Sequence, residues 1–161
     1  MNEELEQALK LREDGKKKES NQLFIKLAEE FPTEAILQYQ CAWSFDVLGE
    51  EAKAAPYYES AIELGIPTRE LEGALLGLGS TYRTLGEYEK SKRVFLNAIK
   101  LFPKNKAIQV FYSMTLYNLQ EHSEAMELLL TNLIDTTSDE EILSYKKAIR
   151  FYSNKLGDTW K

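Results

Sequence analysis

The chain has 161 residues, a formal net charge of −6, eight glycines, four prolines and one cysteine. These counts exclude a collagen-like repeat, a disulfide-stabilised scaffold and a proline-rich linker. Hydrophobic residues make up 43% of the chain, so we expect a buried core rather than disorder. Only three valines occur among many leucines, glutamates, lysines and alanines, and this composition favours helices over strands.

Several classes of protein are disfavoured by what the sequence lacks. Cys41 is the single cysteine, so we expect a small buried core residue rather than a disulfide or a cysteine zinc site. Residues 1–6 are polar and acidic, whereas a signal peptide needs a basic start and an apolar run. No apolar run approaches the roughly 18 residues of a membrane span, and the acidic charge disfavours binding to phosphate backbones. We therefore expect a cytoplasmic protein that binds neither membranes nor nucleic acid.

The main internal feature is a repeat of helical patterns that end at equivalent positions. Gly15 and Gly49 are 34 residues apart, as are Gly86 and Gln120. A glycine can adopt positive φ and so end a helix, which makes these positions the expected turns of helix–turn–helix units. The spacing divides a single domain, residues 1–161, into units 1–34, 35–68, 72–105 and 106–139, with residues 69–71 inserted.

Small residues recur at the two positions where the helices of one unit would cross. The eighth position of the units holds Ala8, Ala42, Gly79 and Ser113, and the twentieth holds Ser20, Ala54, Ser91 and Ala125. A bulky residue at the twenty-fourth position (Phe24, Tyr58, Phe95 and Leu129) would fill the space between the helices. Gly73 and Gly77 are four residues apart, a spacing that also predicts close helix packing.

The third unit carries the fullest set of these features. They are Leu78, Gly79, Tyr82, Gly86, Tyr88, Ser91, Phe95, Ala98 and Pro103. The set resembles the tetratricopeptide repeat (TPR). The segments 79–86 (GSTYRTLG) and 55–59 (APYYE) are also similar to a bacterial family of small, free-standing TPR proteins, tetratricopeptide repeat family 5, over roughly residues 3–135. The resemblance implies an all-α fold, a TPR-type α-solenoid of four repeats, with no assigned catalysis.

An amphipathic segment follows the fourth unit. Ser138 and Glu141 have the spacing of a capping box, and the apolar residues that follow recur on one face of a predicted helix over residues 140–157. Such a helix would cap the last unit, because terminal repeats expose an apolar face. The alternative is a docking helix for a partner. Trp160 is either part of a frayed tail or an anchor.

The resemblance implies that the first helices of the units line a concave binding surface. The candidate partner-binding residues at the groove positions are Tyr39, Trp43, Leu76, Arg83, Val110, Met114 and Tyr117. Tyr and Trp are frequent anchors of interfaces, so an open groove would suit a peptide or an amphipathic helix. The alternative is that these side chains pack on one another. Leu5 and Leu9 stand where chaperone-binding members carry Lys and Asn, which disfavours a carboxylate clamp.

The sequence thus favours a protein–protein interaction scaffold whose protein or peptide partner it does not identify. The alternative is a self-associating module, such as a homodimer, that uses the same surface. Catalysis is disfavoured, because adjacent carboxylates such as Glu50 and Glu51 point about 100° apart on a helix. His122, the single histidine, is expected in a solvated turn. We expect no catalytic residue, no metal and no cofactor, and the GxG in residues 77–79 lacks the preceding strand of a phosphate loop.

Overall fold

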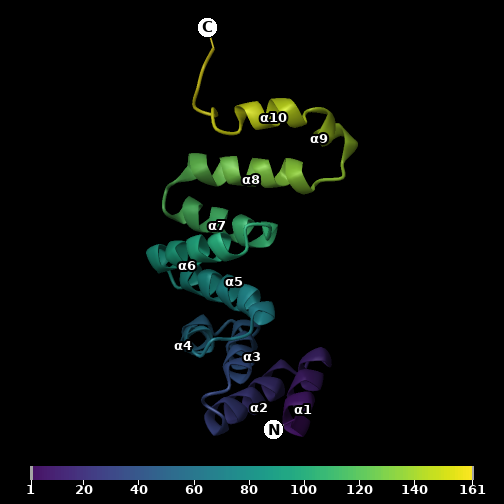
Figure 1. Cartoon of the computed structure of the whole chain (residues 1–161), viewed down its shortest axis with the longest axis vertical. Helices are drawn as coiled ribbons and strands as arrows, with labels where there is room; N and C mark the ends of the chain where they lie inside the picture. The colour runs from purple at the N-terminus through teal and green to yellow at the C-terminus, as the bar shows by residue number, and fades with distance from the viewer. Residues whose placement is uncertain (1, 161) are drawn as a thin grey trace. The chain divides into compact units, whose positions relative to one another are not determined.

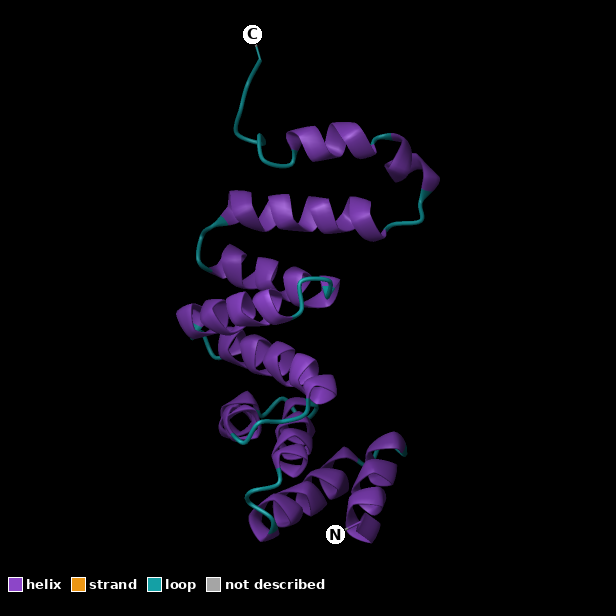
Figure 2. Ribbon diagram, viewed as in Figure 1, coloured by secondary structure: helices purple, strands orange, loops and turns teal. Residues whose placement is uncertain are grey.

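The computed structural model describes residues 2–160, and all regular structure among them is helical (Figure 1, Figure 2). The chain divides into two compact units, one up to Glu87 and one from Tyr88. The first unit contains α1 (Asn2–Glu13), α2 (Lys17–Glu30), α3 (Ala35–Asp46), α4 (Glu51–Glu63) and α5 (Thr68–Thr84). The second contains α6 (Tyr88–Leu101), α7 (Lys106–Asn118), α8 (His122–Thr136), α9 (Glu140–Ser144) and α10 (Lys146–Tyr152).

Consecutive helices pack against each other within each unit. In the first unit α1 contacts α2, α2 contacts α3, α3 contacts α4 and α4 contacts α5. In the second unit α6 contacts α7, α7 contacts α8, and α8 contacts α10. This arrangement confirms the all-α fold of helix–turn–helix elements that the sequence predicts.

The predicted turns share one backbone geometry. Gly15, Gly49 and Gly86 have φ of 76°, 71° and 78°, and Gln120 adopts φ 65° at the equivalent place. After each of these residues, the next N–H donates to a carbonyl five residues earlier, as from Lys16 to Leu11 at 2.8 Å. The same bond joins Glu50 to Phe45, Glu87 to Tyr82 and Glu121 to Leu116. These bonds satisfy carbonyls at the helix ends, and the turn geometry persists where glycine is replaced.

The small residues lie at helix crossings, as the repeat predicts. Ala8 and Ser20 are buried, and the Ser20 hydroxyl donates to the Ala8 carbonyl at 2.8 Å. Phe24 is fully buried in the first unit, as Phe95 is in the second. Cys41 is also buried, and burial raises the pKa of its thiol to about 12. The expected burial of this cysteine is thus confirmed.

The C-terminal segment differs from the single helix predicted over residues 140–157. It forms two short helices, α9 and α10, which are separated at Tyr145, and α10 ends at Tyr152. The predicted cap was also wrong, since the carboxylate of Asp139, not Ser138, accepts from the Ile142 N–H at 2.9 Å. Thr137 Oγ1 accepts from the Asp139 N–H at 3.1 Å and so holds this cap in place. A local hydrogen-bond network thus moves the helix start by one residue.

Candidate functional site

An aromatic groove lies in the first unit, between the exposed sides of α3 and α5. It has a volume of about 350 Å³. The groove is lined by Tyr39, Trp43, Asp46, Val47, Tyr58, Gly73, Leu76 and Gly77. Three of the seven predicted partner-binding residues, Tyr39, Trp43 and Leu76, therefore come together here. We call this surface the aromatic groove.

Trp43 is the most prominent side chain of the aromatic groove, and Arg12 fixes its position. Trp43 is 41% exposed. The Arg12 guanidinium lies 4.2 Å from the centre of the Trp43 ring and 4.6 Å from that of Phe24. Arg12 also donates to the Gln40 side chain at 2.7 Å and to the Gln40 carbonyl at 3.2 Å. Cation–π contact and hydrogen bonds together hold one face of the indole, while much of the ring stays accessible.

Burial lowers the pKa of Arg12 below its ordinary value. The guanidinium nevertheless stays charged near neutral pH, because a free arginine titrates far above it. Its Nε is buried without a hydrogen-bond partner among the described residues. The contact of Arg12 with Trp43 connects α1 to α3, and no local pattern in the sequence indicates it.

Two glycines of α5 make room for tyrosines at the base of the aromatic groove. A Cβ atom added at Gly77 would lie 2.5 Å from Cζ of Tyr58 and 2.6 Å from its hydroxyl oxygen. A Cβ added at Gly73 would lie 2.5 Å from the hydroxyl oxygen of Tyr39. The close packing predicted from the spacing of these glycines is confirmed. Sequence reasoning missed that Tyr58 lines the groove, although this spacing was a usable signal.

These contacts predict different effects for the same substitution at the two glycines. Gly77→Ala is expected to lower the free energy of unfolding by about 2 kcal/mol, because the buried Tyr58 ring cannot move aside. Gly73→Ala is expected to be neutral or to add up to about 1 kcal/mol, because alanine favours the helix and Tyr39 is only partly buried. Urea unfolding followed by circular dichroism measures both. Equal effects at the two positions would contradict the packing described here.

Asp46, which lines the aromatic groove, joins three helices. Its carboxylate accepts a hydrogen bond from the Tyr58 hydroxyl at 2.6 Å and one from the Thr81 hydroxyl at 3.1 Å. Burial raises the pKa of Asp46, and the two hydrogen bonds act in the opposite direction. Burial and the nearby Asp46 also raise the pKa of Tyr58. The carboxylate therefore positions the tyrosine at the groove wall.

The other predicted partner-binding residues do not line the aromatic groove. Arg83 lies near the end of α5, half-buried, and its Nε has no hydrogen-bond partner within residues 2–160. Val110, Met114 and Tyr117 lie on α7 in the second unit, at a spacing that places them along one helix face. Met114 and Tyr117 are exposed, and the Tyr117 ring lies 4.7 Å from that of His122. Their part in binding stays a prediction.

The only histidine of the chain lies in the second unit, outside the aromatic groove. His122 begins α8, is exposed, and lies 3.1 Å from the Gln120 side chain. Between residues 2 and 160, no three His, Cys, Asp or Glu side chains come together in a way that could hold a metal ion. None of the described helices has the length and apolar character needed to cross a bilayer.

Two solved structures share the fold of this chain. The crystal structure of YrrB, described as a TPR protein with an unusual peptide-binding site, has a TM-score of 0.64 and 15% sequence identity. That comparison covers 91% of this chain and 84% of YrrB. The MamA RS-1 ArsTM double mutant has a TM-score of 0.71 at 11% identity, over 94% of this chain and 92% of that one. At these identities the likeness shows the fold alone.

Sequence comparisons point to the same family. Superkiller protein 3 of Saccharomyces cerevisiae is 30% identical over 94 residues, which cover 54% of this chain and 6% of that protein. The chain therefore spans only a small part of that relative. The family model described as Tetratrico peptide repeat, TPR_5, matches residues 34–156, further toward the C-terminus than the sequence resemblance indicated. Because this match covers more than half of the sequence, the chain belongs to the tetratricopeptide repeat family, and its fold is the TPR-type α-solenoid.

Proposed function

We propose that the protein is a non-catalytic interaction scaffold that binds a peptide or an amphipathic helix of a partner protein in the aromatic groove. The main support for this proposal is that the Trp43 ring is held by Arg12 and is still 41% exposed. An aromatic side chain held in one position loses little conformational entropy when a ligand covers it. Rigid, partly exposed Trp and Tyr side chains are the residues that most often dominate binding energy.

The shape and chemistry of the aromatic groove agree with this role. Tyr39 stacks on Trp43 with ring centres 6.3 Å apart, so the two rings form one continuous apolar wall. Leu76 of α5 lies on the opposite side, and the groove volume of about 350 Å³ is at the lower end of ligand-binding sites. Asp46 and Arg12 are engaged by neighbours within the unit. Apolar side chains of a partner are therefore the expected ligands.

Removal of the Trp43 side chain tests the proposal. Peptides are selected against the wild-type protein from a random display library, and their dissociation constants are measured by fluorescence anisotropy. Trp43→Ala is expected to weaken binding by about 30-fold, the equivalent of about 2 kcal/mol for an anchor residue. Leu64→Ala is the matched control, because Leu64 is 40% exposed but lies outside the groove.

The outcomes separate the proposal from its alternatives. Equal affinity of Trp43→Ala and wild type, with unchanged helical content, would show that the selected peptides bind elsewhere. A molecular mass that doubles with concentration in light scattering, and returns to monomer in Trp43→Ala, would identify a second copy of the chain as the occupant. A strict monomer that loses peptide binding on Trp43→Ala supports the scaffold.

A further inference from the structure

Asp46 is the one charged residue in the lining of the aromatic groove, and its carboxylate forms no ion pair within residues 2–160. Its hydrogen bonds come from the neutral hydroxyls of Tyr58 and Thr81. These bonds orient the carboxylate but leave its negative charge in place. An ionised carboxylate has about four acceptor positions, so Asp46 can also accept a hydrogen bond from a ligand.

The charges near the aromatic groove do not neutralise Asp46. Burial raises the pKa of Asp46, and the nearby carboxylate of Glu51 adds to this rise. Burial also raises the pKa of Tyr39, an effect that Arg12 opposes and that Glu70 and Asp46 strengthen. Arg12 does not line the groove, and its guanidinium donates to α3. The groove therefore presents a partly buried negative charge on an aromatic wall.

A purely apolar ligand would leave this charge in an unfavourable state. Covering the groove removes water from the carboxylate of Asp46, which is costly for an unpaired charge, whereas a cation beside the carboxylate offsets the cost. Aromatic faces also attract cations, and the Tyr39 ring centre lies 6.3 Å from that of Trp43 and 6.1 Å from that of Tyr58. An acidic ligand would be repelled by Asp46. The groove thus suits an apolar segment that carries one cation.

We propose that the partner segment bound in the aromatic groove carries a basic side chain, lysine or arginine, that pairs with Asp46. This inference rests on the proposed function and specifies the chemistry of its ligand. Apolar side chains of the segment cover Trp43 and Leu76, and the methylene stem of the basic residue lies along the aromatic wall. Arg12 lies against the Trp43 ring, so repulsion between like charges directs the basic end away from that ring and toward Asp46.

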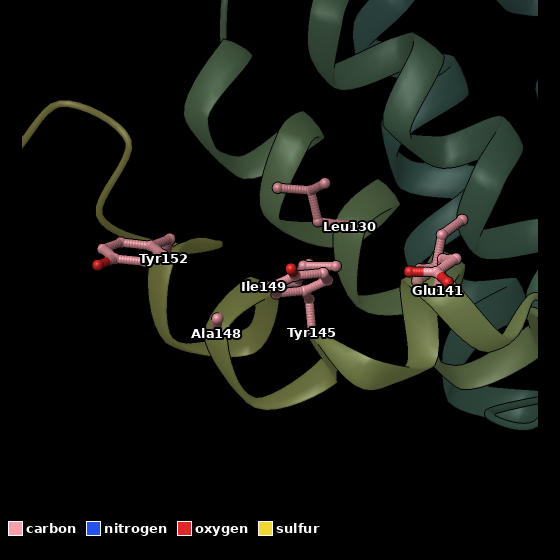
Figure 3. A pocket seen from close by; sticks show the side chains of 7 residues that line it. Leu130, Glu141, Tyr145, Ala148, Ile149 and Tyr152 are labelled. Carbon is pink, nitrogen blue, oxygen red and sulfur yellow. The ribbon is translucent and has the colours of Figure 1, made fainter.

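A second groove that contains a carboxylate provides a control. This C-terminal groove lies in the second unit between α8 and the pair α9–α10, has a volume of about 540 Å³, and includes Leu130, Glu141 and Tyr152 in its lining. Figure 3 shows Glu141 and Tyr152 toward opposite ends of it. Glu141 is exposed, so its carboxylate stays solvated and gains little from a cationic ligand.

Peptide selection from a random display library, run in parallel against the wild-type chain and Asp46→Asn, tests the inference. We expect lysine or arginine at one fixed position beside apolar residues in the wild-type set and not in the Asp46→Asn set. A double-mutant cycle then compares the best wild-type peptide with a copy that has methionine in place of the basic residue, by fluorescence anisotropy. Asp46→Asn should weaken binding of the basic peptide about tenfold and change binding of the methionine peptide by less than about twofold.

Two variants control for net charge. Glu141→Gln removes one negative charge from the C-terminal groove, and Glu63→Gln removes one from an exposed site on α4. Both should leave the affinity for the basic peptide unchanged. A loss in either variant equal to that of Asp46→Asn would overturn the inference, because the attraction would then come from net charge. A wild-type peptide set without a preferred basic position would overturn it too, as would equal binding of the basic peptide by Asp46→Asn and wild type.

Trp43→Ala distinguishes a failure of this inference from a failure of the proposed function. If the aromatic groove is the binding site, this variant weakens binding of the basic and the methionine peptides alike, whatever the role of Asp46. If neither peptide depends on Trp43, or if no peptide is selected, the proposed function fails and the inference fails with it. Circular dichroism of each variant, together with retained binding of the methionine peptide by Asp46→Asn, shows that a lost affinity does not reflect a lost fold.

Discussion

Replacing Phe95 by alanine is expected to lower the free energy of unfolding by about 3–5 kcal/mol. The Phe95 side chain on α6 is 0% exposed, and its ring centre lies 6.2 Å from that of Tyr112 on α7. Truncation to alanine removes this apolar burial and leaves a cavity between two helices, since a close-packed interior collapses only in part. Urea unfolding followed by far-ultraviolet circular dichroism measures the loss.

The adjacent residue provides the control for this prediction. Leu96 is on the same helix but is 48% exposed. Leu96→Ala is therefore expected to change the free energy of unfolding by less than about 1 kcal/mol. Similar losses for Phe95→Ala and Leu96→Ala would contradict the assignment of the twenty-fourth repeat position to the interior.

Replacing Asp46 by alanine is expected to lower the free energy of unfolding by about 2–4 kcal/mol. The substitution leaves the hydroxyls of Tyr58 and Thr81 without their carboxylate acceptor, and an unsatisfied buried donor costs about 1–3 kcal/mol. Asp46→Asn keeps a side-chain oxygen that can accept one of these bonds, so we expect a smaller loss. Urea unfolding at neutral pH compares the two variants with the wild type.

The titration of Asp46 gives this prediction a second readout. Burial raises the pKa of Asp46 in the folded state above its ordinary value of 3.8, so the folded chain holds this proton more tightly than the unfolded chain. The contribution of Asp46 to the free energy of unfolding is therefore fully present below pH 3.8 and falls as the pH rises through the folded-state pKa. The asparagine side chain of the Asp46→Asn variant does not titrate, so the variant lacks this pH dependence.

The free energy of unfolding of the wild type should therefore fall relative to that of Asp46→Asn as the pH rises from the unfolded-state pKa of Asp46 to its folded-state pKa. Taking the difference removes the effects of the other carboxylates, which titrate alike in both proteins. Unfolding by urea at a series of pH values from about 3 to 7 measures it, on either side of the ordinary carboxyl pKa. A difference that does not change with pH would mean that the carboxyl group is not desolvated.

The order of helices and turns could be predicted because it is encoded locally. The 34-residue spacing from Gly15 to Gly49 and from Gly86 to Gln120 identifies turns that share positive φ and the same hydrogen bond. Helix periodicity and turn chemistry depend on residues a few positions apart, so the sequence shows them directly. The C-terminal segment was predicted less well, because Asp139 and Ser138 are both good caps and only the hydrogen bonds choose between them.

The candidate site could be predicted only in part, for a different reason. The repeat register places Tyr39, Trp43 and Leu76 on the inner helices, and the structure brings these three together. The register does not reveal that Arg12, from the preceding repeat, holds the Trp43 ring. Nor does it reveal that Gly77 admits the Tyr58 ring. Both contacts depend on the separation and rotation of neighbouring helices, which side-chain packing sets.

The sequence by itself therefore determined the helical repeat, its turns, its buried small residues and its family. These features follow from short-range spacing and from the sterics of glycine and alanine at helix crossings. Only the tertiary structure decided which side chains stay accessible and which charges are engaged. Trp43 stays exposed beside Arg12, Asp46 accepts hydrogen bonds at the wall of the aromatic groove, and Tyr145 lies exposed in the C-terminal segment. Exposure and charge pairing are set by contacts between helices, and these contacts join residues far apart in the chain.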